Sequence, residues 1–344
     1  MKFDVWLIDP QPLTEMPKIA NKVEENGFDG LWTVETGNDG FFPLILAAEH
    51  SQRINMGTSI AVAFARNPTT LAAMAWDLAR YSDGRFIMGL GTQVKAHIER
   101  RYGIPWEKPL RKLRETVEVM HAVWDSWQNG TKLRYEGEFF NLSLMIPNFS
   151  PEPLDGPRPP VYVSAVNKGM LKLAGKVCDG VILHPFHSTT YLKEFALPML
   201  DEGLAVNGRT RADITTCCSV FAMPTDGEKA AAHYEQYARQ QIAFYMSTPA
   251  YRVVLEHSGS DHHGWVGTSE QLSQLARQGE WDQMRGLITD EMLDAFAISG
   301  KWGELPAKAQ ARFGDMIDRT NFYLPFSPTE EQDGWRAAVA GFRR

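Results

Sequence analysis

Apolar and polar residues follow two alternating patterns along most of the chain: short apolar runs of strand length and longer stretches with helical spacing. The clearest unit spans residues 54–97. An apolar run over 55–64 is followed by Pro68, which is favoured in the first turn of a helix. The next apolar residues recur at the spacing of one buried helix face: Leu71, Met74, Ala75, Leu78 and Ala79. A second run over 85–91 closes the unit, so the two strands are predicted to be parallel, with ligand sites at their carboxyl ends.

The same rhythm of strand and helix continues over the whole chain. The expected strands lie within residues 3–8, 27–34, 55–64, 85–91, 160–166, 180–185, 213–223 and 319–326. The expected helices cover residues 16–26, 68–82, 109–127, 170–176, 190–206 and 329–342. Residues 130–159 and 258–318 break the rhythm, and we interpret both as insertions, the first of them lying over the mouth of the fold. Eight strands alternating with helices predict a (β/α)8 TIM barrel, with residues 1–344 forming a single domain.

Composition and charge narrow the class of protein. With 344 residues and 44% hydrophobic content, the chain can bury one large core. The net charge of −7 gives no general attraction for nucleic acid or for anionic membranes. The three cysteines Cys178, Cys217 and Cys218 form no CxxC motif, so neither a disulfide framework nor a zinc site is indicated. No apolar run reaches the length of a membrane span, and we expect a cytoplasmic protein, as a homodimer or higher homo-oligomer.

Several common site signatures are missing or incomplete. Gly89-Leu90-Gly91 begins like a dinucleotide fingerprint, but Val94 stands where the third glycine belongs. Metal-dependent barrel hydrolases need paired histidines after the first strand, and Asp9-Pro10-Gln11 occupies that place. Asp261-His262-His263 contains metal-ligand residue types, but a hydrated loop is our interpretation of it. No GxSxG elbow is present either, so we expect no metal site and no covalent acyl chemistry.

The remaining polar strand ends suit a bound redox cofactor, which carries the chemistry while the protein orients it. After the fifth strand, Ser164 and Val166 lead into Asn167 and Lys168, and a helix follows. Its first N–H groups, at Gly169 and Met170, are expected to point outward and bind an anion, with Lys168 adding a positive charge. The alternative is an ordinary turn in which Asn167 caps the helix. After the fourth strand, Thr92, Gln93 and Lys95 offer further contacts, although Lys95 is equally consistent with solvated surface charge.

Three segments together resemble the bacterial luciferase-like superfamily of flavin and deazaflavin enzymes: Gly57 to Pro68, Gly84 to Lys95, and Ser164 to Gly180. They span most of the chain in the right order. The run from Gly91 to Arg101 is similar to the branch that uses coenzyme F420, a 5-deazaflavin. The resemblance therefore implies a TIM barrel that binds F420, with FMN as the alternative cofactor.

The resemblance also implies roles for particular residues. In that family a non-prolyl cis peptide forms a bulge in the third strand behind the tricyclic ring. The match places the cis bond at Ser59–Ile60, with Ile60 against one face of the ring and Ala61 beside it. The loop after the second strand departs from the basic or histidine-containing version, because it carries Gly37 and Asn38. Glu35 is then the remaining candidate proton donor, and a structural salt bridge is the alternative for it.

His184 follows the sixth strand and is the second candidate acid or base, with a satisfied strand-end histidine as the alternative. The predicted reaction is hydride transfer between carbon 5 of the deazaflavin and a small organic substrate held near it. If the cofactor is FMN, the same pocket would hold reduced flavin and activate oxygen as a monooxygenase. The sequence also leaves open a barrel that binds flavin without catalysis, and a hydrolytic barrel.

Overall fold

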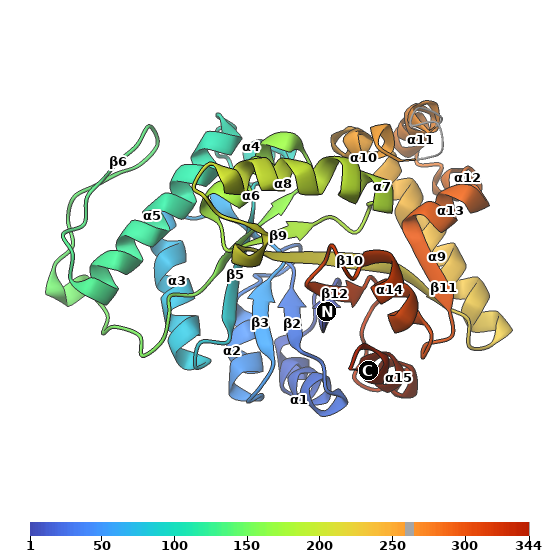
Figure 1. Cartoon of the computed structure of the whole chain (residues 1–344), viewed down its shortest axis with the longest axis horizontal. Helices are drawn as coiled ribbons and strands as arrows, with labels where there is room; N and C mark the ends of the chain where they lie inside the picture. The colour runs from blue at the N-terminus through green and yellow to red at the C-terminus, as the bar shows by residue number, and fades with distance from the viewer. Residues whose placement is uncertain (259–264, 344) are drawn as a thin grey trace.

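The computed structural model describes residues 1–258 and 265–343 (Figure 1), so Asp261-His262-His263 lie outside the described residues. Eight parallel strands close into a barrel, because β12 pairs with both β1 and β10. They are β1 (Lys2–Leu7), β2 (Gly30–Thr33), β3 (Asn55–Thr58) with its continuation β4 (Ala61–Val62), β5 (Phe86–Gly91), β8 (Val161–Ala165), β9 (Gly180–Leu183), β10 (Thr215–Pro224) and β12 (Arg319–Phe322). All the strands expected from the apolar runs are present, and the predicted TIM barrel is confirmed.

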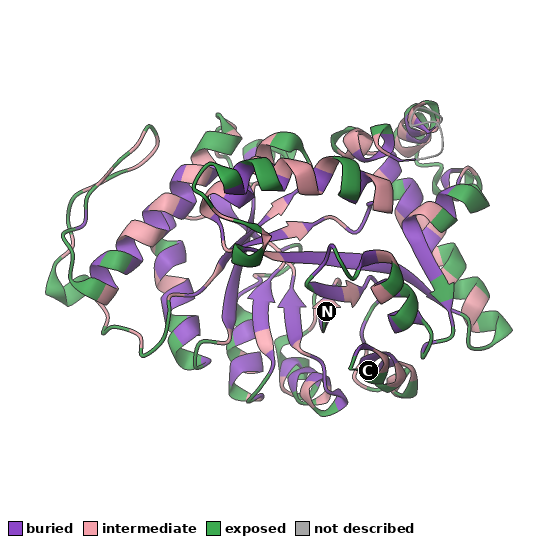
Figure 2. Cartoon of the chain, in the orientation of Figure 1, coloured by how far each residue is buried: buried purple, intermediate pink, exposed green. Residues whose placement is uncertain are grey.

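Helices surround the barrel, and Figure 2 shows buried strands at the centre with exposed outer helix faces. They are α1 (Met16–Asn26), α2 (Phe42–Glu49), α3 (Pro68–Tyr81), α4 (Lys95–Arg100), α5 (Pro109–Asn129), α6 (Lys168–Val177), α7 (Thr189–Tyr191) continuing through a π turn (Leu192–Ala196) into α8 (Leu197–Ala205), α14 (Leu305–Phe313) and α15 (Gln332–Phe342). Helices α2 and α4 were not expected. Helix α2 is apolar on nearly all sides and α4 has only six residues, so neither shows the periodic pattern of one buried face.

Side chains of the barrel strands alternate between the helix layer and the barrel interior. In β1, Phe3 faces outward, where its ring stacks on Phe342 of α15 at 4.4 Å. Asp4 faces inward and accepts hydrogen bonds from Arg319 Nε at 2.9 Å and from Trp32 Nε1 at 2.8 Å. The neighbouring Asp4 raises the pKa of Arg319 against the opposing effect of burial, so the guanidinium stays charged in the floor of the barrel.

The first insertion, residues 130–159, was predicted to lie over the barrel mouth. This prediction is wrong for the second half of the insertion. A short hairpin, β6 (Tyr135–Glu136) with β7 (Asn141–Leu142), projects from one end of the molecule (Figure 1). The following residues contact Trp76 and Gln128, in the second halves of α3 and α5. Helices of a parallel barrel run back from the mouth, so these contacts lie toward its closed end.

The second insertion lies at the other end of the long axis (Figure 1). It begins earlier than the predicted start at residue 258, because α9 (Glu228–Met246) and α10 (Arg252–Glu256) belong to it. It continues with α11 (Val266–Gln278), α12 (Trp281–Gly286), α13 (Asp290–Phe296) and one strand, β11 (Ala297–Gly300). The strand was not expected, because it follows α13 directly, with no turn residues to mark its start. It pairs in parallel with residues 221–224 of β10, while residues 217–220 pair with β12. The length of β10 allows it to serve both partners.

One outer face is apolar. Phe42 and Ile45 of α2 and Tyr81 of α3 are 60%, 42% and 53% exposed. Together with Met74 and Leu78 they line a groove of about 480 Å³ between the two helices. None of the described helices combines the length and apolar character that crossing a membrane requires.

Candidate active site at the barrel mouth

The third strand is interrupted at the mouth of the barrel. It ends at Thr58, the Ser59–Ile60 peptide bond is cis, and the chain resumes as β4 beside β5. The position of this bond is the one expected from the family resemblance. Thr58 secures the interruption, because its hydroxyl donates to the Gly89 carbonyl at 2.7 Å and accepts from the Gly89 N–H at 3.0 Å.

The interruption turns Ile60 toward two other strand ends. A Cβ placed on Gly91 would lie 2.7 Å from Ile60 carbons and 2.7 Å from Ser164 Oγ. Ile60, Gly91 and Ser164 are therefore adjacent, although they come from three separate parts of the sequence. Because Gly91 has no side chain, the side chains of Ile60 and Ser164 can lie against its backbone, and the three residues form a wall on this half of the mouth. Ile60 and Ser164 are partly exposed there, whereas Ile87 and Tyr162, deeper in the barrel, are buried.

Glu35 is held by an ion pair beside this wall. Its carboxylate accepts from Arg66 Nη1 at 2.8 and 3.0 Å and from the Val62 N–H at 2.7 Å. Arg66 also pairs with Asp39 at 2.6 Å, and these two acidic groups raise the pKa of Arg66 against the effect of burial. The structural salt bridge, which was the alternative for Glu35, is thus present. The network ties the loop after β2 to the segment after β4.

The start of α6 is arranged differently from the prediction in one respect. The side chain of Asn167 accepts from the Met170 N–H at 3.2 Å, and the Asn167 carbonyl accepts from Leu171. The Met170 N–H is therefore not free, which corrects the predicted cradle, because the helix cap uses it. Lys168 is exposed and forms no ion pair with a described carboxylate, so positive charge remains at this helix start. Val166 lies beside it, with its carbonyl accepting from the Tyr191 hydroxyl.

The three residues predicted to bind the cofactor after β5 do not all lie at the mouth. Thr92 and Gln93 are partly exposed at the mouth, and Gln93 has a left-handed backbone with φ of 60°. Such a conformation is uncommon for residues other than glycine and is frequent at functional sites. Lys95 instead begins α4, is 65% exposed and lies 3.8 Å from Glu99. The surface-charge alternative for Lys95 therefore describes its position in this structure.

His184 belongs to an aromatic cluster on the other half of the mouth. Its ring lies 4.1 Å from that of Tyr251 and 4.4 Å from that of Tyr245. Burial by these neighbours lowers the pKa of His184 to about 3. His184 Nδ1 accepts from the Phe186 N–H at 3.1 Å, so the neutral ring carries its hydrogen on Nε2. It is a hydrogen-bond donor at neutral pH, and Nδ1 is not free to take up a proton.

Two polar atoms on this half of the barrel were missed from the sequence. Trp6 Nε1 and Asn321 Oδ1 are buried, and neither has a hydrogen-bond partner among the described residues. Asn321 also lines a cavity of about 20 Å³ inside the barrel, together with Ser59 and Ser219. Buried polar atoms in native proteins are nearly always paired, so these atoms indicate a bound water or ligand. The alternation of inward residues along β1 and β12 was the only sequence signal for them.

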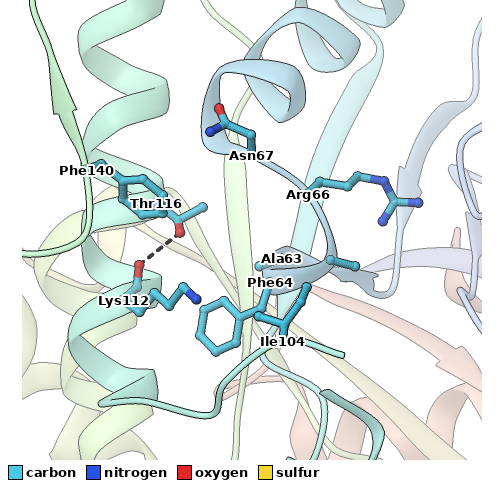
Figure 3. Close-up of a pocket in the computed structure, with 9 residues that line it drawn as sticks. Ala63, Phe64, Arg66, Asn67, Ile104, Lys112, Thr116 and Phe140 are labelled. Atoms are coloured by element: carbon cyan, nitrogen blue, oxygen red, sulfur yellow. Dashed lines mark hydrogen bonds between the residues drawn. The ribbon is translucent and has the colours of Figure 1, made fainter. Parts of the chain in front are cut away.

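A separate cleft opens beside Arg66 and is drawn in Figure 3. It holds about 240 Å³ between the segment after β4 and helix α5. Lys112 points its ammonium at the Phe64 ring, 5.2 Å from the ring centre, and Arg66 turns away toward Glu35. Among the described residues, no group of three or more His, Cys, Asp or Glu side chains is placed to hold a metal ion.

These features define a parallel β/α barrel whose mouth has an aliphatic wall around a cis peptide on one side and an aromatic cluster on the other. The sequence profile of the family described as "Luciferase-like monooxygenase" matches residues 1–318. The chain belongs to this family of oxidoreductases and monooxygenases.

Individual relatives cover almost the whole chain. The "uncharacterized protein Rv1360" of Mycobacterium tuberculosis is 45% identical over 97% of this chain and 96% of its own length. The 5,10-methylenetetrahydromethanopterin reductase of Archaeoglobus fulgidus is 29% identical over 87% of this chain and 86% of its own length. Among solved structures, the coenzyme F420-dependent tetrahydromethanopterin reductase of Methanopyrus kandleri superposes with a TM-score of 0.78. It is 22% identical and covers 98% of this chain and 97% of its own, so it supports the fold.

Proposed function

We propose that this chain is an F420-dependent oxidoreductase that transfers hydride between carbon 5 of the deazaflavin and a small organic substrate. The observation that carries the proposal is the wall formed by Ile60, Gly91 and Ser164, on which a flat ring can lie. The F420-dependent and pterin-reducing relatives support the choice of cofactor. When bound, the deazaflavin supplies the two electrons of the reaction as hydride.

The residues around the wall fit such a group. Ile60, flanked by Ser59 and Ala61, supports one face of the ring and leaves the other open to substrate. Thr92 and Gln93 lie at the edge, where the hydroxyl and amide can bind polar ring atoms. The Gly169 N–H and Lys168 at the start of α6 bind the anionic part of the cofactor, since a helix start and a lysine both attract negative charge. A side chain at position 91 would collide with Ile60 and Ser164 and displace the wall that supports the ring.

In this proposal Glu35 positions the chain around Ile60 and does not transfer a proton. It receives hydrogen bonds from Arg66 and from the Val62 N–H. Removing it would release the segment that carries Ile60. We therefore retain Glu35 and His184 at the site as groups that shape it, Glu35 through its ion pair and His184 through its Nε2–H donor.

The cofactor is tested by titrating the purified chain in parallel with F420 and with FMN, each oxidised and reduced, and following cofactor fluorescence or absorbance. We expect saturable F420 binding that is tighter than FMN binding. Tight FMN binding without any response to F420 would refute the cofactor and favour the monooxygenase alternative, which the family description also accommodates. Binding of F420 with no turnover of any hydride donor or acceptor would instead favour a non-catalytic binding protein.

We further propose that two copies of the chain associate through the apolar face of α2 and α3. The groove there is flanked by Asp77 and Arg80, of opposite charge and three residues apart on α3. Around a twofold axis, Asp77 of one copy can meet Arg80 of the other while the apolar side chains pack together. The cysteines are all free and buried, which supports a reducing compartment such as the cytoplasm.

A further inference from the structure

Reduction of a carbonyl moves a proton as well as a hydride, and neither expected proton carrier is free to supply it. Glu35 is occupied by Arg66 and the Val62 N–H. His184 is neutral with its hydrogen on Nε2, and its Nδ1 is taken by the Phe186 N–H. A different hydroxyl, thiol or carboxyl group must therefore exchange a proton with the substrate.

Two tyrosine hydroxyls meet at the mouth. Tyr323 follows β12 and Tyr245 lies on α9, and their hydroxyl oxygens are 2.6 Å apart. Two hydroxyls need only one hydrogen to bond to each other, so the second hydrogen is available to a third group. Neither hydroxyl makes another hydrogen bond within residues 1–258 and 265–343. Tyr245 is partly exposed, which leaves the pair accessible from the mouth.

The tyrosine pair stands across the barrel from the aliphatic wall. The strands from β12 to β5 are ordered β12, β1, β2, β3 and β5 around the barrel. Strand β5 is therefore four positions from β12 in a ring of eight strands. Tyr323 therefore lies opposite Gly91. The Trp6 ring, whose Nε1 has no partner among the described residues, is 5.5 Å from the Tyr323 ring, and His184 touches Tyr245.

The surroundings of the pair favour a neutral, planar ligand. Rings from Trp6, Phe221 and Tyr251 surround the two tyrosines and offer stacking surface. Burial raises the pKa of Tyr245 and of Tyr323, and the charge of Asp9 contributes to the shift at Tyr323. Both phenols are thus protonated at neutral pH, and Asp9 disfavours an anionic ligand on this side.

We propose that the Tyr245–Tyr323 hydroxyl pair is the proton donor of the reaction and that the substrate is an uncharged aromatic or conjugated carbonyl compound. This rests on the proposed function. When bound, the reduced deazaflavin would supply the hydride for the new C–H bond at the carbonyl carbon and become oxidised, while the C=O π bond breaks. A phenol O–H breaks as the alcohol O–H forms. The phenolate regains a proton from water through its partner hydroxyl.

The donor is tested with two compounds of nearly the same shape, acetophenone and α-methylstyrene, of which only the ketone accepts a hydrogen bond. Binding is measured by equilibrium dialysis on the chain loaded with whichever cofactor it binds. We expect the preference for the ketone to fall about fivefold in Tyr323→Phe and in Tyr245→Phe, as loss of one hydrogen bond of about 1 kcal/mol predicts. Tyr237→Phe is the matched control, because its ring packs on Tyr323 at 6.4 Å and its hydroxyl bonds to no described residue.

Three results would overturn the inference. They are an unchanged ketone preference in both variants, binding of neither compound, and binding of the anion 4-acetylbenzoate as tight as that of acetophenone. Single-turnover oxidation of the reduced cofactor by acetophenone should slow at least tenfold in either variant with cofactor affinity unchanged, and an equal rate would also refute the donor. A chain that binds FMN in place of F420 but keeps the tyrosine-dependent preference would refute the proposed cofactor alone.

Discussion

Arg66 Nη1 lies 3.0 and 2.8 Å from the two carboxylate oxygens of Glu35. This contact joins the loop after β2 to the chain just beyond β4, two elements that each contribute to the barrel mouth. Glu35 is almost fully buried, and Arg66 and the Val62 N–H supply hydrogen bonds that replace its lost hydration.

We expect Glu35→Ala to lower the free energy of unfolding by about 3 kcal/mol, since it leaves a partly buried arginine with less compensation. Urea denaturation of the variant and the wild type measures this loss. Glu99→Ala is the control, because it removes an exposed pair with Lys95 and should cost less than about 1 kcal/mol. A Glu35→Ala protein with wild-type stability but no turnover would contradict the structural role and favour proton transfer by Glu35.

Gly91→Ala should weaken cofactor binding at least tenfold. The added methyl would lie 2.7 Å from both Ile60 and Ser164 Oγ, so it would push these side chains out of the wall on which the ring is proposed to lie. Fluorescence titration with F420 gives the affinity, and circular dichroism shows whether the barrel is folded. Gly156→Ala serves as the control, since its new methyl group meets nothing within 4 Å. Equal affinity of Gly91→Ala and wild type would remove the wall from the cofactor site.

Lys168→Met should weaken binding of the anionic cofactor several-fold, and more strongly at low salt than at high salt. The reason is that an exposed ammonium acts through a screened Coulomb attraction. Titrations at two ionic strengths measure the effect. Lys172→Met changes a lysine one turn further along α6 that pairs with Glu202, and it should leave affinity unchanged. If the two variants behaved alike, the start of α6 would not be the anion site.

Stability should fall as the pH drops from about 6.5 toward 4. Burial lowers the pKa of His187 from 6.5 to about 4 and that of His184 to about 3. Below pH 6.5 the unfolded chain therefore binds protons that the folded chain does not, at a cost of up to about 1.4 kcal/mol per pH unit for each histidine. Urea midpoints between pH 5 and 8 measure the slope. His187→Asn should reduce it, and replacing the exposed His233 should not.

Ile45→Glu should convert a dimer into a monomer, because it places a charge in the apolar groove between α2 and α3. Analytical ultracentrifugation of the variant and the wild type gives the mass of each. Leu144→Glu alters a residue that is 77% exposed just after the β6–β7 hairpin and should leave the mass unchanged. A wild-type protein that sediments as a monomer would refute association through this face.

Local sequence patterns predicted much of the barrel. Strands such as β5 and helices such as α3 have periods that one chain segment reveals by itself. Helix α2 escaped because a fully apolar segment shows no period, and strand β11 escaped because it follows α13 with no turn residues between them. The cap formed by Asn167 was foreseen as an alternative, but whether it or a ligand uses the Met170 N–H depends on side-chain geometry.

The amino-acid sequence by itself determined the order of strands and helices and the positions of the polar strand ends, because spacing, turn residues and caps act over a few residues. The tertiary structure decided which distant residues meet. It paired Glu35 with Arg66, set Gly91 against Ile60 and Ser164, and brought the hydroxyls of Tyr245 and Tyr323 together across 78 positions of sequence. Those contacts form only when the barrel closes, since closure, and no local preference, fixes which strand ends and insertions share the mouth.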